Sequence, residues 1–154
     1  MSDVCNNLPP VPSPSPHEQS TWLPKHRRSV GVARRLLLDF LRSSPPGLAD
    51  LFSSTGELLL SELVTNAVQH ARVPADRLLL VRFALSPAEL RIEVHDAGRP
   101  FPSTVATTKQ PGLDAEAGRG LFLVDRLSHS WGCFPRPDGI GKAVWCTIAP
   151  AHPQ

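Results

Sequence analysis

The sequence TGELLLSELVTNAVQHA, residues 55–71, carries the strongest structural pattern of the chain. Its apolar residues recur at helical spacing and a Val-Pro pair follows, so it predicts a long helix from about residue 54 to 71, N-capped by Thr55. Glu62 and Asn66 lie one turn apart on one face of this helix. A carboxylate orients nucleophiles and an amide oxygen suits Mg²⁺, although such a pair alone is more often part of a solvated helix face.

Helical and strand patterns flank this long helix on both sides. VGVARRLLLDFL, residues 30–41, predicts an amphipathic helix with an apolar stripe at Val32, Leu36 and Phe40. RLLLVRFAL (77–85) and ELRIEVHD (89–96) are separated by a three-residue gap and predict an antiparallel hairpin. In the second of these runs apolar and polar residues alternate, which is typical of a half-buried strand.

The second half of the chain predicts a lid followed by a helix and another hairpin. Residues 97–117 contain several prolines and glycines without periodicity, and a stretch of this length inside a domain is usually functional. A short helix is expected to open at Gly118. WGCFP (131–135) and KAVWCTI (142–148) then predict two strands around a Pro-Asp-Gly turn.

This order of elements predicts a two-layer sandwich of the α/β (α+β) class, with helices packed on a mixed, mostly antiparallel sheet. The 154 residues, 41% of them hydrophobic, suffice for one domain with a real core, which we assign to residues 19–150. Residues 1–18 alternate prolines with polar residues and predict an extended or disordered tail.

Composition narrows the classes of function. The net charge is only +2 and the 16 Lys and Arg residues are scattered, so no direct nucleic-acid partner is expected. No apolar run approaches the roughly 20 residues of a membrane span, and the N-terminus shows no signal peptide, so a cytoplasmic protein without membrane contact is expected. The three cysteines form neither a metal-binding motif nor a disulfide framework.

Two further motifs combine with the Glu62/Asn66 pair. In Asp96-Ala97-Gly98, a carboxylate at a strand end is able to accept a hydrogen bond from a ligand amine, and the glycine admits the ligand closely. In Gly118-Arg119-Gly120-Leu121, exposed N–H groups at a helix start suit an anion such as phosphate. Taken singly, each motif is also common as an ordinary turn or helix start.

In their joint order these motifs resemble those of the GHKL ATPases, which share the Bergerat fold. ELLLSELVTNAVQHA is similar to the N box, VHDAGRP to the first glycine box and GRGLFLVDRL to the second. The closing SWG…PDGIGKAVW is similar to the tail of bacterial anti-sigma-factor serine kinases, and the resemblance covers roughly residues 19–150. It implies a histidine-kinase-like ATPase domain that binds ATP and Mg²⁺.

The resemblance also implies a role for each matching residue. Glu62 would be the general base or water-positioning carboxylate, and Asn66 would bind Mg²⁺ beside the phosphates. Asp96 would accept a hydrogen bond from the adenine amino group, and Gly98 would let the purine approach. The second glycine box would hold the phosphates, largely through backbone N–H groups, with residues Gly118, Arg119, Gly120 and Leu121.

The function implied by the resemblance is that of an anti-sigma factor. Such a protein sequesters a sigma factor and, as a serine/threonine kinase, phosphorylates an anti-anti-sigma partner; it commonly forms a homodimer through the first helix and the sheet edge. This sequence departs from the pattern at two positions. Pro100 replaces the second glycine of the first glycine box, and Ala143 replaces a threonine, which removes one expected hydroxyl contact near the phosphates.

Three other classes of protein compete with this interpretation. A histidine-kinase catalytic module shares the ATP site but needs a phosphoacceptor histidine on an upstream dimerisation helix, and His26 lies too near the proline-rich segment for that. A non-catalytic ATP-binding regulator would bind partners without transferring phosphate. A nucleic-acid-binding protein is the weakest alternative, because no basic stripe with interleaved aromatic residues is present.

Overall fold

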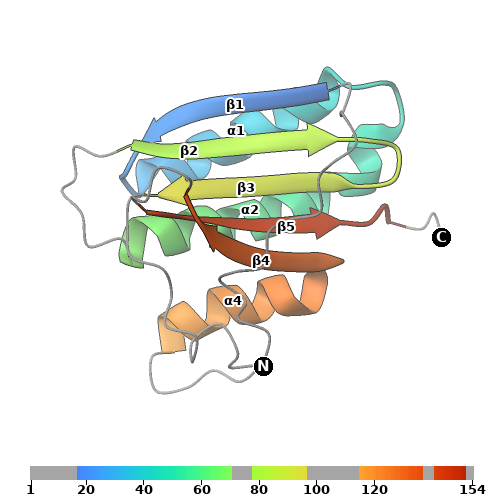
Figure 1. Cartoon of the computed structure of the whole chain (residues 1–154). Helices are drawn as coiled ribbons and strands as arrows, with labels where there is room; N and C mark the ends of the chain where they lie inside the picture. The colour runs from blue at the N-terminus through green and yellow to red at the C-terminus, as the bar shows by residue number, and fades with distance from the viewer. Residues whose placement is uncertain (1–16, 71–77, 97–114, 137–140, 152–154) are drawn as a thin grey trace.

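The chain forms two layers, a five-stranded sheet and three helices that pack against one of its faces (Figure 1). The structure is a computed structural model that describes residues 17–70, 78–96, 115–136 and 141–151, and these counts refer to those residues. Three predicted features lie outside the described residues: most of the tail, most of the lid and the Pro-Asp-Gly turn. The predicted α+β sandwich is confirmed.

The sheet has the strand order β1-β2-β3-β5-β4, and every pairing within the described residues is antiparallel. The sheet is therefore simpler than the mixed one that the sequence predicts. Both predicted hairpin strand pairs, β2–β3 and β4–β5, are present at nearly the predicted positions. The strands are β1 (His17–Pro24), β2 (Leu78–Leu85), β3 (Leu90–Asp96), β4 (Ser130–Pro135) and β5 (Lys142–Ile148).

Strand β1 lies where the sequence predicts no strand. Its sequence, HEQSTWLP, lacks an apolar alternation because β1 is an edge strand and only Leu23 is buried. It pairs with β2 along its whole length, from His17 opposite Leu85 to Pro24 opposite Leu78. The expected boundary between tail and domain, at residue 18, falls inside this strand.

The helices are α1 (Arg28–Arg42), α2 (Leu48–His70) and α4 (Ala115–Leu127). α2 begins six residues earlier than predicted, because LADLF continues the apolar periodicity and the left-handed Gly47, at φ 92°, ends the preceding turn. Thr55 is therefore inside α2, and its assignment as N-cap is wrong. None of these helices, within the described chain, combines the length and apolar character needed to cross a membrane.

The core side of α1 is turned slightly from the predicted stripe. Phe40 is buried as predicted, whereas Val32 and Leu36 are only partly buried. The fully buried side chains are those of the residues that follow the predicted stripe by one position, Ala33, Leu37 and Leu41. These contact α2 and the sheet in one continuous hydrophobic cluster.

The two faces of the sheet differ in chemistry. Alternate strand residues point at the helices and form the core with them, and burial there raises the pKa of the Cys146 thiol to about 12. No described helix covers the other face, which we call the open face. It carries Arg91, Glu93 and His95 of β3, yet all seven residues of β3 are buried, so the prediction of a half-buried strand is wrong. These three side chains contact one another, because Glu93 forms an ion pair with Arg91 and a hydrogen bond with His95.

Candidate nucleotide site

Three segments predicted to carry the chemistry meet at one end of the molecule. α2 ends at His70, β3 ends at Asp96 and α4 begins at Ala115, and all three ends lie on the same side of the fold (Figure 1). α2 contacts β3, β5 and α4, so it is the common neighbour of all these elements. The fold thus brings together residues that are far apart in the sequence.

Glu62 and Asn66 lie in the second half of α2, toward this end. Asn66 is buried, 6% exposed, whereas Glu62 is half-buried, and neither forms a hydrogen bond or ion pair with another described residue. Burial raises the pKa of the Glu62 carboxyl above its ordinary value. The two side chains are one helical turn apart, so a half-buried carboxylate and an unused amide point from the same helix face.

Asp96 is the last residue of β3 and only 1% exposed. The alternation of β3 puts it on the same face as Ile92 and Val94, toward the helices, where α2 also packs. Ala143 pairs with His95 and packs with Phe134 and Trp145 on the open face. A threonine at residue 143 would therefore point away from Asp96, and the loss of a hydroxyl contact near the phosphates stays a prediction.

The glycine-rich segment lies inside α4 and not at its first residue. α4 begins at Ala115, three residues before Gly118, because Ala-Glu-Ala are strong helix formers. The four N–H groups without a partner in the helix are those of residues 115–118, so Gly118 is still among them. The side chains of residues 115–120, Arg119 included, lie outside the described residues, as does Gly98. Leu121 is 2% exposed and buries its side chain in the protein.

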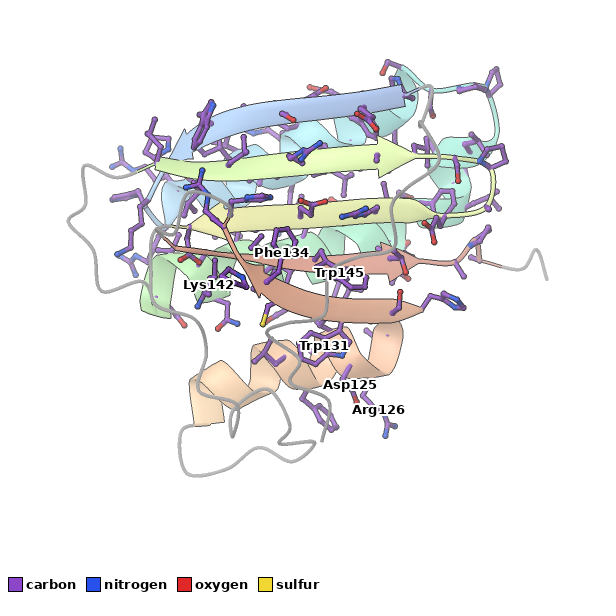
Figure 2. The ribbon with its side chains drawn as sticks, viewed as in Figure 1. Asp125, Arg126, Trp131, Phe134, Lys142 and Trp145 are labelled. Atoms are coloured by element: carbon purple, nitrogen blue, oxygen red, sulfur yellow. The ribbon has the colours of Figure 1, made fainter. Side chains whose placement is uncertain are left out.

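A tryptophan–aspartate contact holds α4 in place and was not predicted from the sequence. The Trp131 Nε1–H on β4 donates a 3.0 Å hydrogen bond to Asp125 Oδ1 on α4 (Figure 2). Val124, one residue before Asp125, is fully buried in the core. The only signal in the sequence is the six-residue spacing between an Asp near the end of a helix and a Trp at the start of a strand. The contact fixes the helix whose first turn faces the site.

The residues of the site are suited to a nucleotide and a hard cation. Asn66 offers a neutral oxygen, and Glu62 offers a carboxyl group whose pKa is raised above its ordinary value by burial. The described residues contain no group of three or more His, Cys, Asp or Glu side chains able to hold a metal by themselves. A cation at this site would also need oxygen atoms from the bound nucleotide.

A scan against protein families and a search of solved structures connect this geometry to known proteins. The family model for the histidine kinase-like ATPase domain matches residues 23–147 of this chain. No curated protein matches the sequence. A matching solved structure is the histidine kinase domain from the Erythrobacter litoralis EL346 blue-light activated histidine kinase, with 22% identity and a TM-score of 0.48. The alignment covers 82% of this chain and 61% of that domain.

The fold is that of an α+β domain in which the predicted site residues Glu62, Asn66 and Asp96 lie on the helix side of the sheet, toward the ends of α2 and β3. The family match spans most of the chain, from Leu23 in β1 to Thr147 in β5. The chain belongs to the histidine kinase-like ATPase domain family, as the GHKL resemblance implies. Family membership implies ATP binding.

Proposed function

We propose that this chain is an ATP- and Mg²⁺-dependent serine/threonine kinase that acts as an anti-sigma factor. It would sequester a sigma factor, phosphorylate an anti-anti-sigma partner and so regulate transcription in the cytoplasm. The observation that carries the proposal is the pairing, on α2, of a half-buried Glu62 with a buried Asn66 that has no partner among the described residues. The assignment to the anti-sigma-factor kinases within the family is based on the motif resemblance alone.

The division of labour follows from the chemistry of the two side chains. An amide cannot take up a proton, so Asn66 would hold Mg²⁺ together with phosphate oxygens of the nucleotide. Mg²⁺ supplies charge neutralisation for phosphoryl transfer. Glu62 is then free to accept the proton of the acceptor hydroxyl, and its raised pKa makes it a stronger base than an exposed carboxylate. Asp96 would accept a hydrogen bond from the adenine amino group.

The partners of the proposal are two proteins and a second copy of the chain. A homodimer would use α1 and the edge strand β1, which lie next to each other. Edge strands leave one row of backbone groups unpaired and are suited to pairing across chains. No direct contact with nucleic acid belongs to the proposal.

Labelled ATP, a candidate anti-anti-sigma protein and three variants test the kinase. Glu62→Ala should reduce phosphate transfer by about 10²–10⁴-fold and leave ATP binding nearly unchanged. Asn66→Ala should weaken Mg²⁺-dependent ATP binding as well as transfer. Glu57→Ala, on the same helix, is the matched control and should behave as wild type.

Two results would count against the proposal. Transfer by Glu62→Ala at the wild-type rate would show that the base lies elsewhere. A wild type that binds ATP and a partner but transfers no phosphate would favour the non-catalytic regulator.

A further inference from the structure

The open face of the sheet is exposed over β1 and β2 but buried over most of β3, β5 and β4. Trp22 on β1 is 53% exposed and Leu78 on β2 is 49% exposed. On β5, by contrast, Trp145 is 2% and Ala143 is 0% exposed, and both pack with Phe134 of β4 in one apolar cluster (Figure 2). We call the buried residues of this face the buried patch: Arg91, Glu93, His95, Phe134, Ala143, Trp145 and Thr147.

Side chains of the sheet account for only part of this burial. The Arg91 guanidinium lies over the Trp145 ring, 5.8 Å from its centre, but Arg91 is itself only 8% exposed. The three described helices lie on the other face, and the exposures are those of a single chain, so no partner molecule explains them. Part of the cover over the patch is therefore missing from the described residues.

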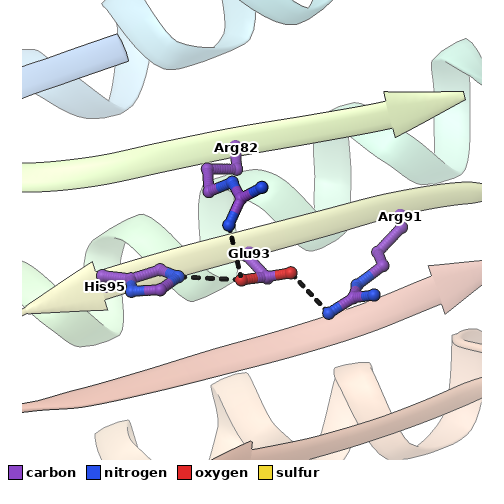
Figure 3. Close-up of polar contacts among 4 residues, drawn as sticks. All are labelled: Arg82, Arg91, Glu93 and His95. Atoms are coloured by element: carbon purple, nitrogen blue, oxygen red, sulfur yellow. Dashed lines mark hydrogen bonds and ion pairs between the residues drawn. The ribbon is translucent and has the colours of Figure 1, made fainter. Parts of the chain in front are cut away.

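Glu93 lies at the centre of the charges of the patch (Figure 3). Its Oε2 is 2.5 Å from Arg91 Nη2, and its Oε1 is 2.8 Å from His95 Nε2 and 3.9 Å from Arg82 Nη1. Burial alone would raise the pKa of Glu93, but the hydrogen bond from His95 and the nearby positive charges outweigh it and lower the pKa. Because this carboxylate already has its partners within the sheet, a segment that covers it needs no charge of its own.

The undescribed segments inside the chain join the sheet at the end nearest the nucleotide site. Residues 71–77 precede β2, residues 97–114 follow β3, and residues 137–140 lie between β4 and β5. All three attach at the end of the sheet where β3 terminates in Asp96. Residues 152–154 are too few to cover several strands.

Residues 1–16, which we call the N-terminal segment, join the sheet at its opposite end. They precede His17, which pairs with Leu85, and Leu85 pairs in turn with Leu90 at the start of β3. The buried patch extends to this end, because Thr147, one residue before the end of β5, is 4% exposed. The N-terminal segment is therefore the undescribed segment best placed to cover the patch.

The sequence of the N-terminal segment, MSDVCNNLPPVPSPSP, suits an apolar surface whose charges are already paired. Asp3 is its only charged side chain, and its prolines favour the polyproline II conformation. With three residues per turn, that conformation lines up Leu8, Val11 and Pro14 along one edge. Proline-rich segments bind surfaces lined by aromatic side chains, because they are extended beforehand and lose little entropy on binding.

The N-terminal segment is also long enough to reach the patch. Neighbouring strands lie about 4.8 Å apart, so β5 is roughly 14 Å from β1 across the sheet. Polyproline II rises about 3.1 Å per residue, so about five residues span this distance. Counted back from His17, five residues bring the chain close to Val11 at β5, the strand that carries Trp145.

We propose that the N-terminal segment crosses the open face and packs Leu8 and Val11 against the apolar cluster of Phe134, Ala143 and Trp145. The open face is thus an internal docking surface whose occupant is a proline-rich part of the same chain. This surface lies on the side of the sheet opposite the nucleotide site and is independent of the proposed kinase activity.

Hydroxyl-radical footprinting of the full-length protein, read by mass spectrometry, tests this contact. In the wild type, Trp145 should be oxidised much more slowly than the exposed Trp22. The double variant Leu8→Asp/Val11→Asp should oxidise Trp145 at least about tenfold faster, because an aspartate does not stay in an apolar contact. Ser13→Asp/Ser15→Asp adds the same charge to the same segment away from the Leu8 edge, and should behave as wild type.

A photocrosslink locates the N-terminal segment without any substitution. Cys5 lies in this segment, whereas Cys133 and Cys146 are buried, so a benzophenone maleimide should react with Cys5 in the folded protein. On illumination, crosslinks should form within one chain, from Cys5 to β4 or β5.

The outcomes separate the N-terminal segment from other covers of the patch. Phe83, 2% exposed in the core, should stay protected in every variant, and if the Asp double variant exposes it the crosslinks decide. Equal protection of Trp145 in wild type and Leu8→Asp/Val11→Asp would overturn the proposal, as would an absence of crosslinks to β4 and β5. Crosslinks between two chains would also overturn it and assign the cover to a second copy. Equal oxidation of Trp145 in both double variants would reduce the effect to added charge.

Discussion

Asp96→Asn exchanges a buried carboxylate for an amide of the same shape at the end of β3. The amide is able to turn a donor toward the adenine amino group, so the charge-assisted hydrogen bond is lost. We expect ATP and ADP affinity to fall by about 10–100-fold with the fold intact. Calorimetric titration measures this, with Asp50→Asn in the exposed first turn of α2 as control. Unchanged affinity in folded Asp96→Asn would remove Asp96 from the adenine site.

Glu62 should titrate above the ordinary glutamate value of 4.5, because burial favours its neutral form. The base works only when ionised, so phosphate transfer should be lost as pH falls through this raised pKa. Carboxyl NMR, with the Glu62 signal assigned by Glu62→Gln, measures the midpoint without requiring activity. A midpoint at or below 4.5 would contradict the burial argument.

The position of a residue is predicted well where its spacing within one helix determines it. The burial of a residue is predicted poorly where it depends on the neighbouring strand. The four-residue interval of Glu62 and Asn66 places them on one helix face in any α-helix, and the structure agrees. The charges of β3 look solvated in the sequence. They are buried because Arg82 faces Glu93 across the β2–β3 ladder, and that register depends on a separate part of the chain.

At the scale of elements, α4 depends on β4 for its position. Trp131→Phe keeps an aromatic ring in the core and removes the hydrogen bond to Asp125. We expect about 1 kcal/mol lower stability and a weaker nucleotide affinity, because the first turn of α4 faces the site. Urea unfolding and ATP titration measure the two effects. Asp125→Asn, which keeps an acceptor oxygen, should lose less, and equal losses would show that the hydrogen bond is not the cause.

Element types followed from sequence periodicity, whereas some element ends did not. β5 was predicted residue for residue, since its apolar run ends on both sides at clear breaks. β1 escaped prediction because an edge strand with one buried residue needs no apolar pattern. α2 and α4 both start earlier than predicted, because good helix formers extend a helix beyond its functional motif.

For the molecule as a whole, the cluster around Glu93 should make the free energy of unfolding depend on pH in the acidic range. Its pKa is lowered in the folded state, so its stabilising contribution is present above pH 4.5 and is lost as pH falls through the folded value. Glu93→Gln leaves Arg91 without its counter-charge and should cost about 3 kcal/mol at pH 7. Urea unfolding of both proteins should converge at low pH. A difference independent of pH would assign the loss to packing, and Glu57→Gln is the control.

The three tryptophans differ in their exposure to solvent, so their intrinsic fluorescence reports on three different parts of the protein. Trp22 is 53% exposed on the open face, Trp131 donates a hydrogen bond to Asp125 near the end of α4, and Trp145 is 2% exposed against Gly132. The chain has no tyrosine, so its near-ultraviolet emission comes from these rings. Iodide should quench Trp22 first, and single-tryptophan variants would report changes at the open face, at the contact of α4 with β4 and in the sheet beside Gly132 as separate emission changes.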